Sequence, residues 1–216
     1  MHILVKSGLG IGTIAGVSGL GYGIYSNVQS KPEVHEEKTE TPSYAEKLSG
    51  TLLSVEDGQN STEWGKRLEK LKVAREEDLV ESLKLIKGKK SPSEATQKDV
   101  QNWCKDNIKN PSKDEKNKEF LNIQSYCVFS IKEKISNAVN ESEDEGSEKW
   151  KKGHDVLLTI NDENQLDEKL KEAKKKKDAE AKKAIKEWCT AEYQKPYKGE
   201  KDQGFINAKK LCIDNV

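Results

Sequence analysis

The chain has 216 residues, of which 33% are hydrophobic and 35% are charged, and its mean hydropathy is −0.91. Its 38 basic and 38 acidic side chains cancel to a formal net charge of zero. A neutral surface of mixed sign exerts no long-range attraction on a phosphate backbone, so the composition argues against nucleic-acid binding. Because so few residues are apolar, only thin hydrophobic cores can form, and we expect covalent cross-links to contribute to stability.

The first predicted element is an uncharged, glycine-rich stretch near the N-terminus. No charged residue occurs from Ser7 to Val28, and a helix of this length can cross a hydrocarbon core of ~30 Å. Lys6 precedes the stretch, whereas Lys31 and three glutamates follow it, a distribution that favours a cytoplasmic N-terminus with the remainder outside. We predict a transmembrane signal-anchor over residues 1–28, with a cleaved signal peptide as the main alternative.

Residues 29–60 combine prolines and glycines with acidic and polar side chains. This composition is typical of a stalk between an anchor and a folded region. We predict a polar linker over 29–60, with a short helix near Tyr44 to Leu53.

A first helical module is predicted over residues 61–140. Ser61 is a candidate N-cap, and apolar residues then recur at helical spacing until Gly88. The segment from Ser91 to Glu94 has serine at the N-cap, proline at the first turn and glutamate at N3, so it predicts the start of the next helix. An apolar stripe from Phe120 to Ile135 predicts one further amphipathic helix.

A second helical module is predicted over residues 141–216. Its apolar residues recur at helical spacing from Leu166 to Trp188 without an intervening glycine or proline, so one long helix is predicted here. No stretch of the chain alternates polar and apolar residues as a half-buried strand does. We therefore expect an all-α fold, in which an N-terminal transmembrane helix precedes two tandem helical-bundle modules of similar plan.

Two tryptophans are each followed directly by a cysteine, and a phenylalanine and a second cysteine lie downstream. The two copies, displaced by 85 positions, are Trp103-Cys104, Phe120, Cys127 and Trp188-Cys189, Phe205, Cys212. A further tryptophan precedes each copy, at Trp64 and Trp150. Every cysteine and every tryptophan of the chain belongs to this pattern, which therefore indicates a tandem duplication. We expect its six aromatic residues to form a repeated core.

The spacing of the cysteines predicts two disulfides. If antiparallel helices flank the loop at Pro111, Cys104 and Cys127 lie equally far from the midpoint of the loop and face each other. Cys189 and Cys212 do the same around the corresponding loop of the second module. Each pair can then reach the ~5.5 Å between Cα atoms that a disulfide needs. Reduced cysteines that pack as small hydrophobic residues are the alternative.

We expect no catalytic residue, no metal and no cofactor. No Cys-x-x-Cys occurs, and His2, His35 and His154 fit no zinc-ligand spacing. A catalytic thiol is disfavoured because only His154 lies in either module. Motifs of nucleotide-binding loops, zinc proteases and serine hydrolases are absent. The run from Lys174 to Lys177 is expected to be a solvated helix face, with a nucleic-acid or membrane patch as the alternative.

A short N-terminal hydrophobic segment, a polar stalk and Lys/Glu-rich modules with the Trp…Trp-Cys…Phe…Cys pattern resemble large paralogous families of uncharacterised proteins in haemotropic mycoplasmas. The resemblance implies a membrane-anchored surface protein with a role in host-cell contact or antigenic variation, and it brings no catalytic residues. We expect a non-enzymatic, single-pass protein of the cell membrane whose modules are extracellular and contact a host protein or cell surface. The alternative is an inward-facing, membrane-tethered scaffold with reduced cysteines that binds a partner helix.

Overall fold

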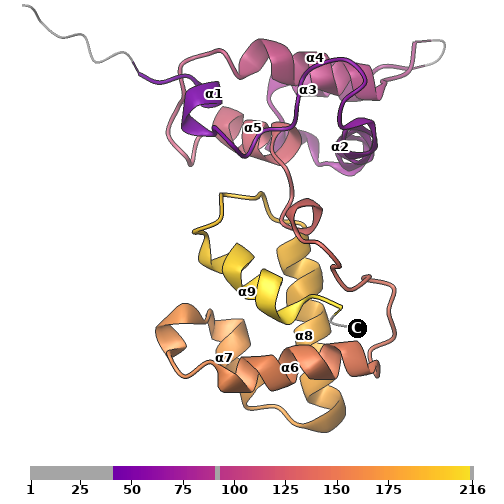
Figure 1. Cartoon of the computed structure of the whole chain (residues 1–216). Coiled ribbons are helices and arrows are strands. Elements are labelled where there is room, and N and C mark those ends of the chain that lie inside the picture. The colour runs from indigo at the N-terminus through magenta and orange to yellow at the C-terminus, as the bar shows by residue number, and fades with distance from the viewer. Residues whose placement is uncertain (1–40, 91–92, 215–216) are drawn as a thin grey trace, which may run out of the picture. The chain divides into compact units, whose positions relative to one another are not determined.

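A computed structural model of the chain describes residues 41–90 and 93–214 (Figure 1). Within these ranges every regular element is helical, with nine α-helices, three short 3-10 helices and isolated β-bridges in place of strands. The predicted all-α class is therefore confirmed. The predicted transmembrane signal-anchor over 1–28 lies outside the described residues, and none of the described helices is long and apolar enough to cross a membrane.

The first half of the described chain, residues 41–128, packs around its own core. Its helices are α1 (Tyr44–Lys47), α2 (Ser61–Val73), α3 (Glu81–Lys87), α4 (Gln97–Asn107) and α5 (Lys118–Cys127). Helix α4 contacts α2, α3 and α5, so it lies at the centre of this half. The apolar faces that meet there include the fully buried Trp64, Leu71, Leu83 and Val100.

The second half, residues 129–214, repeats this arrangement around a second core. Its helices are α6 (Glu148–Thr159), α7 (Glu168–Lys174), α8 (Asp178–Tyr193) and α9 (Gln203–Leu211). Helix α8 contacts α6, α7 and α9, as α4 does with its neighbours in the first half. Trp150, Leu157, Leu170 and Ile185 are fully buried in this core.

Residues 41–60 belong to the packed fold, whereas the sequence predicts a polar linker over 29–60. Tyr44 and Leu53 are buried in the first core. Their segment is held by antiparallel bridges, Ser43 with Pro111 and Leu52 with Val128. The short helix predicted near Tyr44 to Leu53 is present as α1 over Tyr44–Lys47. Pairing of the backbone with distant residues leaves no signal in the local composition, so the sequence hides that this segment belongs to the packed fold.

The same backbone pairings recur in the second half. Ser130 pairs with Pro196 and Ala138 with Ile213, at displacements of 85 to 87 positions from the bridges of the first half. Equivalent backbone pairings therefore occur near Ser43 and near Ser130, and both lie ahead of the module starts predicted at 61 and 141.

The helix predicted to start at Ser91 begins instead at Gln97. Thr96 and Asp99 form a complete capping box, in which the Thr96 hydroxyl accepts the N–H of Asp99 and the Asp99 carboxylate accepts the N–H of Thr96. This box satisfies the free N–H groups of the helix end.

The apolar stripe from Phe120 to Ile135 is not one helix, because α5 ends at Cys127. Val128 is extended, and the N–H of Phe129 donates to the carbonyl of Thr51 at 2.9 Å. Ile131 and Ile135 are buried, but in the core of the second half. The helical spacing across this stretch therefore joins residues that face two different cores.

The long helix predicted from Leu166 to Trp188 is broken into α7 and α8, which end and begin at Lys174 and Asp178. Asp178 has a left-handed φ of 48°, which marks a sharp change of direction. Both helices contact α6, and residues of both are buried in one core. The gain from packing both apolar faces overrides the local helix propensity of the lysine run.

Candidate functional site

Two disulfides lie at equivalent places in the two halves. Cys104 of α4 is bonded to Cys127 of α5, and Cys189 of α8 is bonded to Cys212 at the end of α9. The Cα atoms of the two pairs are 5.5 and 5.7 Å apart. All four residues are buried, so both predicted disulfides are present and water does not reach them directly.

The six aromatic residues of the repeat pattern are all buried, at positions Trp64, Trp103, Phe120, Trp150, Trp188 and Phe205. The indole nitrogen of Trp103 donates to the hydroxyl of Ser82 at 2.8 Å, and that of Trp188 donates to the carboxylate of Asp167 at 2.8 Å. Asp167 also caps α7, because its other oxygen accepts the N–H of Leu170. These hydrogen bonds therefore connect α4 to the start of α3 and α8 to the start of α7.

A buried ion pair joins the two halves. The guanidinium of Arg67 on α2 donates to the carboxylate of Glu133 at 2.6 Å and to the carbonyl of Val128 at 2.8 Å. The N–H of Ser130 donates to the same carboxylate at 2.8 Å. Burial opposes ionisation of Glu133, but the hydrogen bonds from Arg67 and Ser130 outweigh it and hold the pKa of Glu133 below its ordinary value.

Helical periodicity does not single out Arg67, although its residue type carries a signal. Only two of the 38 basic residues of the chain are arginines, Arg67 and Arg75. Arginine is preferred over lysine where a cation must be buried against a carboxylate, because its planar group donates several hydrogen bonds at once. A rare arginine within a predicted apolar helix face therefore pointed to a buried pair, while its partner could be found only in the structure.

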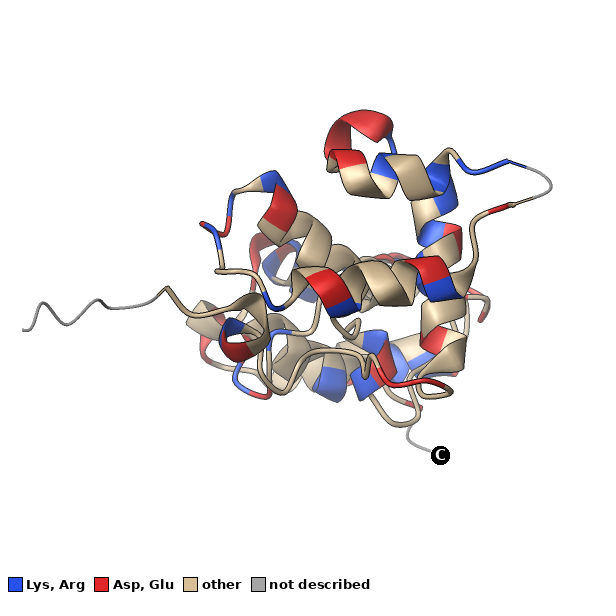
Figure 2. Cartoon of the chain, turned by 90° about the horizontal axis from the view of Figure 1, so that it is seen from above, with Lys and Arg blue, Asp and Glu red and all other residues tan. Residues whose placement is uncertain are grey.

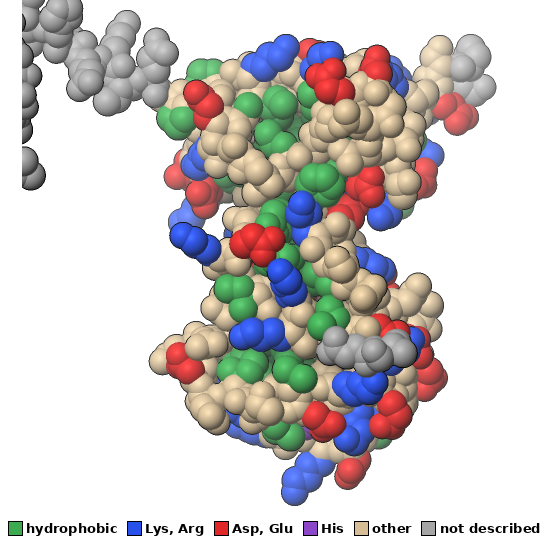
Figure 3. Space-filling model, viewed as in Figure 1, with side chains coloured by type: hydrophobic (Ala, Val, Ile, Leu, Met, Phe, Trp, Pro, Cys, Tyr) green, Lys and Arg blue, Asp and Glu red, His purple; other side chains and the backbone are tan. Residues whose placement is uncertain are grey.

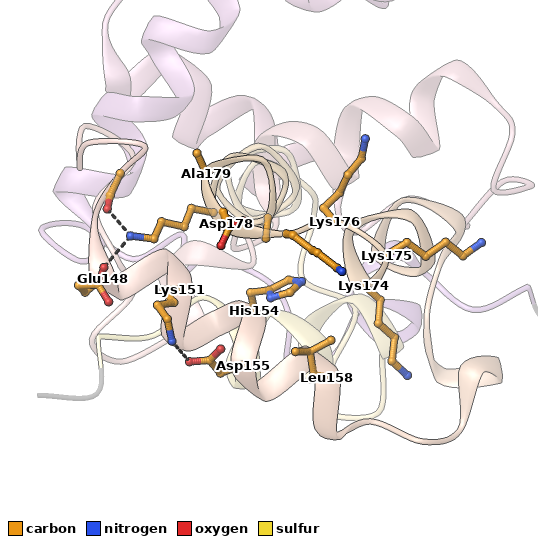
Figure 4. A pocket seen from close by; sticks show the side chains of 14 residues that line it. Glu148, Lys151, His154, Asp155, Leu158, Lys174, Lys175, Lys176, Asp178 and Ala179 are labelled. Carbon is orange, nitrogen blue, oxygen red and sulfur yellow. Dashed lines mark hydrogen bonds and ion pairs between the residues drawn. The ribbon is translucent and has the colours of Figure 1, made fainter.

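A cavity of about 660 Å³ lies in the second half, between α6 and the start of α8 (Figure 4). His154 lines it and is buried, with its Nε2 atom 3.1 Å from the carbonyl oxygen of Ala173. In the described part of the chain, no group of three or more histidine, cysteine, aspartate or glutamate side chains has the arrangement of a metal site.

Comparison of the chain with protein-family models, with curated proteins and with solved structures finds no match.

Proposed function

We propose that the chain is a membrane-anchored, non-enzymatic surface protein that displays two disulfide-stapled helical modules outside the cell. Residues 1–28 form its signal-anchor, and the modules contact a host protein or a host cell surface. The observation that supports this most directly is the pair of equivalent buried disulfides, because disulfides form and persist in oxidising, extracytoplasmic surroundings.

A second line of support comes from how the two halves differ. At some core positions the same residue type recurs, as in Trp64 and Trp150, whereas Ile123 corresponds to Ala208. Exposed positions differ in part: Leu85 corresponds to Glu172, but the exposed pair Glu81–Lys84 recurs as Glu168–Lys171. Exposed positions that tolerate a change such as Leu85 to Glu172 suit a protein whose contacts with a host vary.

The surface chemistry fits the same role. Lysines and carboxylates are interspersed along the helices (Figure 2), and apolar side chains lie between them on the face drawn in Figure 3. A surface of this kind, without a field of one sign, suits contact through local shape and paired charges. It gives no support to binding of a polyanion such as nucleic acid.

Protease treatment of intact cells, combined with thiol labelling, tests the proposal. We expect an external protease to remove residues 41–216 and a maleimide to label the cysteines only after denaturation with a reductant. A non-reducing mass measurement of the native protein should be about 4 Da below the mass of the thiol form, since each disulfide removes two hydrogens. Modules that survive shaving, or cysteines labelled after denaturation without reductant, would instead support the inward-facing scaffold.

A further inference from the structure

The cavity in the second half has the size of a small-molecule site. Its volume of about 660 Å³ lies within the range of roughly 300 to 1,000 Å³ that ligand pockets occupy. It is formed by α6, by the turn that breaks the predicted long helix, and by the first residues of α8. The turn therefore does more than connect two helices, because it builds one wall of the cavity.

The interior of this cavity is mainly apolar. Ala179 and Ala181 of α8 line it together with His154 and Leu158 of α6. In Figure 4, His154 and Leu158 project from α6 on the side that faces the turn. Leu158 is 48% exposed, so an occupant that covered it would remove apolar surface from water. An uncharged chain or ring is the group that such an interior favours.

The lining of the cavity carries an excess of positive charge, although the whole chain is neutral. Six lysines line it against three carboxylates. Two of the carboxylates already pair with lysines: Asp155 lies 2.7 Å from Lys151, and Glu148 lies 2.6 Å from Lys182. The lysines of the turn are therefore in excess, and Figure 4 shows Lys174, Lys175 and Lys176 at the edge of the cavity, extended in different directions.

The positive charge of the turn is only partly offset, by Asp178 in the lining and by Glu180. Lys174 donates to the carbonyl of Ile160 at 2.6 Å, which satisfies a proton but neutralises no charge. Lys176 lies 3.4 Å from Glu180, an exposed pair that contributes little. The alkyl stems of such lysines add apolar wall while their ammonium groups stay in water.

We propose that this cavity binds a small amphipathic anion, with a single alkyl chain against Leu158 and Ala181 and a carboxylate among the lysines of the turn. The equivalent face of the first half carries different residues. Leu68 and Lys72 stand at the equivalent positions of α2 to His154 and Leu158. The proposal does not depend on where the modules are displayed, so it can fail while the proposed function holds.

The test uses the full oxidised chain and follows the imidazole resonance of His154, assigned after His2 and His35 are replaced. Octanoate is expected to shift this resonance saturably in the millimolar range. Octylammonium, which has the same chain and the opposite charge, and acetate, which has the charge without the chain, are expected to leave it in place. Absence of a saturable octanoate shift, or an equal shift with either control, overturns the proposal.

Two substitutions locate the effect, each with a matched control. Leu158→Glu is expected to weaken octanoate binding about tenfold, because it removes an apolar contact and adds a like charge. Leu85→Glu, at a leucine that is 75% exposed in the first half, should leave binding unchanged. Lys175→Glu should weaken binding and Lys109→Glu should not. Unchanged affinity in Leu158→Glu, with the helical circular dichroism retained, would place the ligand elsewhere and refute the assignment.

Discussion

Replacing both cysteines of one disulfide by alanine tests whether the staples hold the thin cores together. The bonds Cys104–Cys127 and Cys189–Cys212 each join residues 23 positions apart. A cross-link over a loop of this length lowers the entropy of the unfolded chain by an amount worth about 3.4 kcal/mol at 25 °C. Because the two separations are the same, we expect both double replacements to lower the unfolding free energy of their own half by that amount.

Equilibrium unfolding in guanidinium chloride, followed by tryptophan emission, measures these losses, since each half contains two tryptophans. The protein with both disulfides reduced serves as the control and should unfold at lower denaturant than either double replacement. A loss below about 1 kcal/mol in either half would show that the core holds without its staple. Losses that differ between the halves by more than about 2 kcal/mol would refute the entropic explanation, because the loop lengths agree.

Three further outcomes follow from the contacts of the described residues. Glu133→Gln should lower the free energy of unfolding by about 3 kcal/mol, because it leaves the guanidinium of Arg67 buried without its counter-charge. Glu46→Gln, at the equivalent exposed position, is the control and should lower it less in the same denaturant assay. The pKa of Glu133 is lower in the folded than in the unfolded state, so its ionised form stabilises the fold above the unfolded pKa, and this stabilisation is lost as pH falls through the folded pKa. Between pH ~6 and ~2 the free energy of unfolding should therefore fall less in Glu133→Gln than in the unsubstituted protein. Gly153→Ala should lower the free energy of unfolding by about 2 kcal/mol, because the added Cβ would lie 2.3 Å from a backbone carbonyl oxygen of α9. The control, Gly65→Ala, should instead raise the melting temperature, because its Cβ meets only one side-chain oxygen, at 3.7 Å.

The disulfide pairing could be predicted from the sequence because it depends on a local symmetry. Two cysteines at equal distances from the turn of a helical hairpin face each other whatever the rest of the fold does. The duplicated pattern strengthened the inference, because Cys104 and Cys189 repeat with the same downstream partner spacing. Features that depend on one hairpin alone are within reach of sequence reasoning.

The ends of the helices could not be predicted in the same way, because they depend on which core a residue joins. Ile131 and Ile135 continue the spacing of α5 but pack in the second half. The break at Lys175–Lys177 has no glycine or proline to announce it, and it exists because α7 and α8 both lie against α6. The cavity beside His154 could not be predicted from the sequence either, because the turn between α7 and α8 forms part of its lining.

The position of the disulfides also determines how the chain would respond to a lengthwise pull. Each bond connects the start of a loop to its end, so tension would pass from sulfur to sulfur and bypass the intervening segment. The 23 residue positions between the two cysteines would extend about 70 Å further than the disulfide that spans them, so each disulfide shortens the extended chain by that length. If the chain is anchored as proposed, a partner bound at its C-terminal end would stay closer to the membrane by this length while the disulfides are intact. Reduction of the disulfides would let the chain extend by the same length.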